Sequence, residues 1–230
     1  MLDFPQNNPF AESRKATMAK VVALKGSARN VPGNILRKDP IRPKNQAVRS
    51  REHLLPDEVD ALIKAAGNVG RHRLRDRTIM LTGYRHGLRV SELVDLKWDQ
   101  VDFNRAQMHV NRLKNGSSAT HPIEGDELRL LRRLHREYPN SPFLFTTERR
   151  GPLTRSTVSK LLSRAGREAG LPFPVHPHML RHGTGFYLAN KGIPTRTIQA
   201  YLGHKSIQHT VRYTELSSLA FRGLWSDVAR

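Results

Sequence analysis

Apolar side chains in the larger part of this 230-residue chain recur every three or four positions, and this spacing limits the possible folds most strongly. Between Leu55 and Ala66 they fall on one side of a helix, which an early proline followed by two acidic residues introduces. The same spacing returns over residues 74–84, 130–138, 158–169, 179–190, 195–202 and 206–214. Helices with one apolar face must bury it against other helices, so the sequence predicts a mostly helical fold.

One segment departs from the helical spacing. Residues 108–110 and 119–123 are short runs of strand type, and they flank the polar stretch Lys114-Asn115-Gly116-Ser117. Asn-Gly is the dipeptide that tight hairpin turns favour. The expected fold class is therefore mostly α with a small antiparallel β-sheet.

The first 53 residues lack this periodicity. They contain five prolines and eleven Lys or Arg, but only four Asp or Glu. Such a segment cannot bury enough apolar surface to offset the entropy that it would lose on ordering. We expect a basic, flexible N-terminal tail over residues 1–53 and a folded domain over residues 54–230.

The charge of the chain narrows its partners. It has 39 Lys and Arg against 20 Asp and Glu, a formal net charge of +19. Basic surfaces gain affinity for nucleic acids because they release counterions from the phosphates. A polyanion is the expected partner, and composition leaves an anionic membrane or a merely basic, ribosomal type of protein as alternatives.

Two absences exclude further classes of protein. Without cysteine there are no disulfides, no Cys-ligated zinc or iron–sulfur sites and no thiol nucleophile. The longest apolar runs are too short to cross a bilayer or to form the core of a signal peptide. We expect a soluble, intracellular protein without a membrane partner.

Four segments combine side chains suited to phosphate binding and proton transfer. They contain Arg89, Lys114, the pair His178 and Arg181, and the stretch from His204 to Tyr213. The ordinary alternative for Arg89 and Lys114 is a solvated surface charge. His178 and Arg181 share one face of a predicted helix, opposite its apolar stripe, where an arginine can bind a phosphate through two nitrogens.

Glycine and tyrosine positions add to this pattern. Gly183 and Gly185 lie inside the same predicted helix, which costs stability unless another group approaches closely. A tyrosine near a helix end is by default a core residue. Because polar residues surround Tyr213 on both sides, we nevertheless expect it to be presented at the surface.

His178 and His182 stand four residues apart, as zinc ligands on a helix often do. No glutamate lies between them, and no carboxylate nearby completes a shell of ligands. A zinc hydrolase is therefore a minor alternative, and we expect neither a metal nor another cofactor.

Taken in order, these residues resemble the motifs of the tyrosine recombinases, also called the phage integrase family. Three strings of this sequence are similar to the three conserved motifs of the family. They are His-Gly-Leu-Arg89-Val-Ser-Glu-Leu, His178-Met-Leu-Arg181-His-Gly, and Leu-Gly-His204-Lys-Ser with Thr-Val-Arg-Tyr213-Thr. Lys114 falls on the hairpin that holds the family's catalytic lysine. The resemblance covers about residues 55–230, and the string from Asn111 to Pro122 is most similar to the short fimbrial phase-variation recombinases, bacterial enzymes that invert a promoter segment.

The resemblance implies a site-specific recombinase (integrase or invertase type) that cleaves and rejoins DNA through a 3′-phosphotyrosyl intermediate. Tyr213 would be the nucleophile, and Arg89 and Arg181 would neutralise the scissile phosphate. Lys114 would protonate the leaving 5′-oxygen. Residues 54–230 would form the catalytic domain, in the cytoplasm or nucleoid of a bacterium.

Two histidines complete the implied catalytic set. By family analogy His178 would accept the phenolic proton, and His204 would donate a hydrogen bond to the phosphate. Glu92 lies three residues after Arg89, and we expect it to hold the arginine region in place.

The family also implies how the protein assembles. Four protomers would hold two DNA duplexes and pass through a Holliday junction, and accessory DNA-bending proteins are expected because only a tail precedes the catalytic domain. Residues 214–230 would dock on a neighbouring subunit or, equally well, pack within their own chain. The rival interpretations are a type IB topoisomerase-like enzyme that nicks and reseals DNA, and a non-catalytic DNA-binding regulator.

Overall fold

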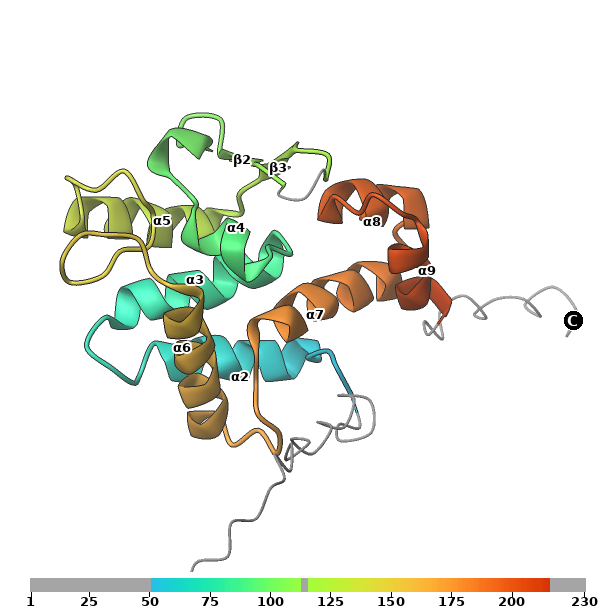
Figure 1. Ribbon diagram of the computed structural model, residues 1–230, viewed down its shortest axis with the longest axis horizontal. Helices are drawn as coiled ribbons and strands as arrows, with labels where there is room; N and C mark the ends of the chain where they lie inside the picture. Colours follow the sequence, from blue (N-terminus) through green and yellow to red (C-terminus); the bar gives the residue numbers. More distant parts are fainter. Residues whose placement is uncertain (1–50, 113–115, 216–230) are drawn as a thin grey trace, which may run out of the picture. The chain divides into compact units, whose positions relative to one another are not determined.

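The computed structural model describes residues 51–112 and 116–215. Its helices are α2 (Pro56–Ala66), α3 (Arg73–Arg85), α4 (Val90–Val94), α5 (Gly125–Glu137), α6 (Arg155–Glu168), α7 (Pro177–Asn190), α8 (Thr195–Leu202) and α9 (Gln208–Glu215). A 3-10 turn, η1 (Trp98–Gln100), and three short strands, β1 (Val101–Asp102), β2 (Gln107–Val110) and β3 (Ala119–Pro122), lie between α4 and α5 (Figure 1). The predicted fold class, mostly α with a small antiparallel sheet, is confirmed.

Three predicted features lie outside the described residues. They are Lys114, nearly all of the predicted tail at 1–53, and the C-terminal segment from residue 216 onward. The division of the chain at residue 53 therefore stays a prediction. Within the described ranges, no helix is both long enough and apolar enough to span a membrane.

The sheet is a three-stranded antiparallel meander in the order β1-β2-β3. Met108 pairs with His121 and Val110 with Ala119, so the predicted hairpin is confirmed. Strand β1 was not predicted, because two residues are too few to show an alternating pattern. Met108 and Val110 point into the core, where each is at most 1% exposed.

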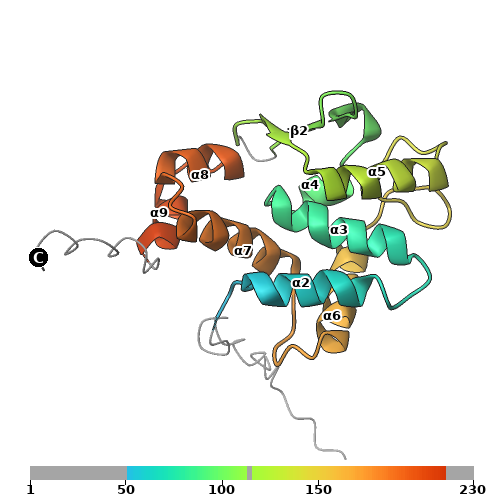
Figure 2. The same cartoon turned by 180° about the vertical axis from the view of Figure 1, so that it is seen from behind.

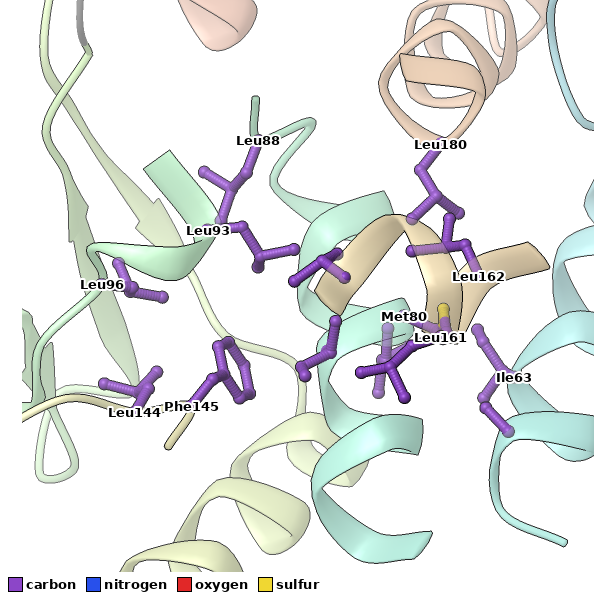
Figure 3. Close-up of a cluster of buried hydrophobic side chains, with 14 of the residues drawn as sticks. Ile63, Met80, Leu88, Leu93, Leu96, Leu144, Phe145, Leu161, Leu162 and Leu180 are labelled. Carbon is purple, nitrogen blue, oxygen red and sulfur yellow. The ribbon is translucent and has the colours of Figure 1, made fainter. Parts of the chain in front are cut away.

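The main core joins helices that are distant in the sequence. Side chains from α2, α3, α4, α6 and α7 meet in one buried cluster that includes Ile63, Met80, Leu93, Leu162 and Leu180 (Figure 3). Each of these residues is at most 9% exposed. The cluster fixes the beginnings of α4 and α7 relative to each other, and those are the helix ends that hold Arg89 and Arg181.

A second, smaller cluster lies where α7, α8 and α9 meet. Figures 1 and 2 show α8 and α9 side by side at the C-terminal end of α7. The buried members of the cluster are Phe186, Ala189, Ile198, Leu202 and Tyr213. Helix α8 ends at Leu202, in agreement with the predicted range 195–202, and the next residue, Gly203, has a φ of 63° in the left-handed region that glycine adopts readily.

Candidate active site

Arg89 occupies the turn between α3 and α4. The preceding Gly87 has a φ of 55°, and a Cβ there would lie 2.4 Å from Leu202, so the turn requires glycine. The guanidinium of Arg89 donates to Oε1 of Glu92 at 2.7 Å, and its backbone N–H donates to Oε2 at 2.9 Å. The expectation that Glu92 holds the arginine region is therefore confirmed by geometry.

Glu92 stays ionised although it is buried. Its side chain is 1% exposed, and burial by itself would raise the pKa of the carboxyl. The hydrogen bonds from Arg89 and the charge of Arg112 outweigh burial and hold the pKa of Glu92 below its ordinary value. The carboxylate thus anchors two arginines.

Arg181 lies on α7 and is only 1% exposed. Its Nη1 donates to the carbonyl of Gly87, and its Nη2 donates to the carbonyl of Leu202 at 2.7 Å. Burial, together with the charges of Arg89 and Arg112, lowers the pKa of Arg181 to about 9, so the group is still cationic at neutral pH. The structure therefore brings the two predicted arginines into one electropositive site, with Arg181 fixed between the α3–α4 turn and the end of α8.

His204 follows Gly203 directly and faces the same site. Its Nδ1 lies 2.8 Å from the hydroxyl of Thr210, and its ring lies over that of Tyr213 with centroids 6.2 Å apart. Burial, followed by the charges of Arg181 and Arg89, lowers the pKa of His204 to about 3. The ring is therefore neutral at physiological pH.

Tyr213 is buried, which makes the prediction that it is presented at the surface wrong. It is 1% exposed, and its ring packs on α7, where a Cβ on Gly185 would lie 2.5 Å from the ring. The polar neighbours Arg212 and Thr214 lie on other sides of α9 and say little about the side facing α7. The predicted close approach at Gly185 is confirmed, with the tyrosine ring as the approaching group.

The hydroxyl of Tyr213 is hydrogen-bonded to Nδ1 of His182 at 2.8 Å. Burial raises the pKa of Tyr213, although the charge of Arg181 opposes the shift, so the phenol is protonated at neutral pH. Burial and the neighbouring His178 lower the pKa of His182 to about 2, which keeps this ring neutral. A neutral histidine thus holds a protonated tyrosine.

His178 lies one turn before His182 on α7, with ring centroids 4.2 Å apart in an edge-on arrangement. Its ring is more exposed than that of His182. Partial removal from water, together with the charge of Arg181, lowers the pKa of His178. The structure places His178 beside the site, while the recorded partner of the Tyr213 hydroxyl is His182.

Sequence reasoning missed two residues of this site. His182 was considered only as a metal ligand, and its position directly after Arg181 was the available signal. Arg112 was not considered, although it is buried and donates to Glu92 at 2.9 Å. Its other partners lie on distant parts of the chain, so no local pattern points to it.

The predicted lysine position can be described only by its surroundings. A Cβ on Gly203 would lie 2.6 Å from Cγ of Arg112 and 3.0 Å from the carbonyl of Ser117. The base of the β2–β3 hairpin therefore packs against the segment that leads to His204. Among the described residues, no group of three or more His, Asp or Glu is arranged to hold a metal ion.

Buried neutral histidines should make the stability depend on pH. Burial is the main reason that the pKa is lowered to about 2 for His182 and to about 3 for His121 and His204. Below pH 6.5 these rings bind protons in the unfolded chain but stay neutral in the folded chain. The free energy of unfolding is therefore greatest above pH 6.5, and we expect it to fall by about 3 kcal/mol between pH 7 and pH 5.5, about 1 for each ring.

Urea unfolding at the two pH values measures this difference. Glu92 and Glu127, whose pKa values lie below their ordinary range, contribute to stability loss only at more acidic pH. A His109→Gln variant on the exposed side of β2 serves as control and should show the same pH dependence as the wild type. Equal stability at both pH values would contradict the neutral, buried state of the three rings.

Comparison with known proteins identifies the family of this chain. The profile of the phage integrase family matches residues 52–219. The chain is 41% identical over 181 residues to the type 1 fimbriae regulatory protein FimE of Escherichia coli (strain K12), which covers 76% of this chain and 91% of FimE. It is 37% identical over 169 residues to the tyrosine recombinase XerA of Pyrococcus furiosus, which covers 72% of this chain and 57% of XerA.

Solved structures agree with the sequence matches. The fold is similar to the crystal structure of XerA recombinase, with a TM-score of 0.66, 27% identity, and coverage of 77% of this chain and 65% of that one. It is also similar to a lambda integrase dimer bound to a COC′ core site, with a TM-score of 0.57, 26% identity, and coverage of 70% and 47%. This chain thus spans nearly all of FimE but less than two thirds of the two solved chains. It belongs to the phage integrase family, the tyrosine recombinases, which are enzymes that cleave and rejoin DNA.

Proposed function

We propose that this chain is a site-specific DNA recombinase in which Tyr213 is the nucleophile. The observation that supports this most strongly is the meeting of Arg89, Arg181, His204 and Tyr213, from four separate segments, around one electropositive site. Attack on a DNA phosphodiester forms a 3′-phosphotyrosyl bond and releases a 5′-hydroxyl. Because the bond energy is kept, a 5′-hydroxyl from another strand can reverse the step and join new ends.

Phosphoryl transfer depends mainly on positioning and on neutralising charge at the nonbridging oxygens. Arg89 and Arg181 provide planar guanidinium groups for this task, and Arg181 is cationic at neutral pH. His204 donates a hydrogen bond to the same phosphate. No metal and no nucleotide cofactor takes part in these steps.

Two proton transfers complete the reaction. We assign His182 to hold the Tyr213 hydroxyl while the tyrosine is buried, and His178, on the more exposed side, to accept the phenolic proton during attack. Tyr213 must leave its buried position to reach DNA, since it is 1% exposed. Lys114, which lies outside the described residues, protonates the leaving 5′-oxygen.

DNA is the partner of this chain. Its relatives are recombinases, and the similar lambda integrase structure contains bound DNA. In our proposal four copies hold two duplexes, aided by accessory DNA-bending proteins, in the bacterial cytoplasm or nucleoid. The basic residues of 1–53 bind the DNA backbone, and the C-terminal residues 214–230 contact a neighbouring copy. The similarity to a fimbriae regulatory protein agrees with the resemblance to the fimbrial phase-variation recombinases, so in our proposal the reaction inverts a DNA segment.

A plasmid assay tests this function. The substrate is a supercoiled plasmid with two inverted copies of a site that is selected by binding from a pool of random duplexes. We expect the wild type to give covalently closed plasmids with the segment inverted. Relaxed plasmids without inversion would favour the topoisomerase-like reaction, and binding without any change in the plasmid would favour a regulator.

A further inference from the structure

Arg112 stands at the base of the β2–β3 hairpin, and its side chain is fully buried, with 0% exposed. Within residues 51–112 and 116–215 the guanidinium makes four hydrogen bonds, to Glu92 Oε2 at 2.9 Å and to the carbonyls of His86 at 2.9 Å, Gly87 at 3.3 Å and Tyr201 at 2.6 Å. Three of these acceptors are backbone carbonyls at a helix end or in a turn, where no N–H of the same helix is available to bond them. A guanidinium satisfies all four at once because its donors point in several directions.

The acceptors of Arg112 are shared with the predicted catalytic arginines. Arg112 and Arg181 both donate to the carbonyl of Gly87, and Arg112 and Arg89 both donate to the carboxylate of Glu92. Arg112 therefore shares one acceptor with Arg181 and another with Arg89. A displacement of Arg112 would release an acceptor that helps to fix each of the other two arginines.

A second pair of neighbouring carbonyls links the same groups. Arg112 bonds the carbonyl of Tyr201, and Arg181 bonds that of the adjacent Leu202. Both lie at the end of α8, directly before Gly203 and His204. Arg112 thus helps to fix the end of α8 on which His204 depends.

Charge leads to the same conclusion. Glu92 is 1% exposed and Arg112 is 0% exposed, whereas the side chain of Arg89 is 27% exposed. The buried Arg112 supplies Glu92 with a countercharge that solvent does not screen. Arg89 binds Glu92 through Nη1, and its partly exposed side chain is the more accessible partner of this carboxylate.

We propose that Arg112 is a positioning residue for cleavage: without touching DNA, it sets the placement of Arg89 and Arg181 on the scissile phosphate. This inference rests on the proposed function. Arg112 acts through Glu92 and through the carbonyl of Gly87. Its effect should therefore depend on the charge of the phosphate that the two arginines neutralise.

The test compares two DNA linkages under single-turnover conditions. One is the normal phosphodiester, and the other is a methylphosphonate, in which a methyl group replaces one charged nonbridging oxygen. We expect Arg112→Met to cleave the phosphodiester roughly 10- to 100-fold more slowly than the wild type, in analogy to the loss of a residue that orients a metal ligand. Relative to the wild type, cleavage of the uncharged linkage should fall much less, because the misplaced charges matter less there.

The chain offers a matched control in Arg75. This arginine is also buried and donates to Asp76 at 2.8 Å and to the carbonyl of Thr146 at 2.7 Å. Among the described residues, its side chain has no hydrogen bond to Arg89, Glu92 or Arg181. Like the loss of Arg112, the loss of Arg75 breaks a buried ion pair and therefore destabilises the protein. Arg75→Met should therefore change the cleavage of both linkages by the same factor.

Arg112→Lys provides a second variant, which keeps a positive charge beside the buried Glu92. A lysine cannot reach the four acceptors as a guanidinium does, so it should show the same selective loss on the phosphodiester. If the Met and Lys variants lose equal factors on both linkages, or lose nothing, the positioning role is wrong; if Arg112→Met does not fold, the lysine variant decides. A wild type that cleaves neither linkage would instead refute the proposed function.

Discussion

Replacement of Arg181 by Gln should abolish DNA cleavage while most of the DNA affinity remains. Arg181 is the more deeply buried of the two phosphate-binding arginines, at 1% exposed, and its cationic group is held by the carbonyls of Gly87 and Leu202. An arginine that neutralises a phosphoryl-transfer transition state contributes roughly 10³- to 10⁵-fold to the rate. Single-turnover cleavage of a nicked duplex and a gel-shift titration measure the two effects separately.

The affinity should change little because one contact of many is lost. The chain carries a net charge of +19, and nonspecific binding grows with the number of phosphates that the protein neutralises. Arg196→Gln is a suitable control. Arg196 is an exposed residue of α8, and its replacement also removes one positive charge from the protein. It should cleave at the wild-type rate, and an Arg181→Gln protein that also cleaves at that rate would remove Arg181 from the site.

Tyr213→Phe should remove all covalent attachment to DNA and leave the fold intact. The phenylalanine ring keeps the packing on Gly185 and Phe186, and only the bond to His182 is lost. A single hydrogen bond of this kind contributes about 1 kcal/mol to stability. Thermal unfolding of the variant should therefore stay close to that of the wild type, while the yield of the adduct falls to zero.

Tyr187→Phe is the matched control for this variant. Tyr187 lies on α7 and is 38% exposed, so the loss of its hydroxyl tests whether any tyrosine near the site affects cleavage. We expect it to form the adduct as the wild type does. An adduct that persists in Tyr213→Phe would show that another residue attacks the DNA.

Local patterns were sufficient to predict most of the fold. The apolar spacing of α2, α5 and α6 gave their positions, because each of these helices buries one face in a shared core. The spacing over residues 195–202 matched α8, which ends directly before the left-handed Gly203. Two-residue strand β1 gave no signal, because it is defined by its pairing with β2.

The site could be predicted in its residue types but not in its contacts. The motifs identified Arg89, Arg181, His204 and Tyr213, which the structure brings together. The burial of Tyr213 depends on the surface that Gly185 opens on another helix, and the sequence around Tyr213 does not contain that information. The role of Arg112 depends on carbonyls from two distant turns, and those become neighbours only in the folded chain.

The central claim is that Tyr213 becomes covalently joined to a 3′-phosphate of DNA. The most direct test incubates the wild type with a nicked suicide duplex, isolates the adduct on a denaturing gel, and maps the modified peptide by mass spectrometry. We predict one adduct, with the cleaved strand attached through its 3′-phosphate to Tyr213 and a free 5′-hydroxyl on the released fragment. Attachment to any other residue, attachment through a 5′-phosphate, or cleavage without a covalent adduct would contradict the account.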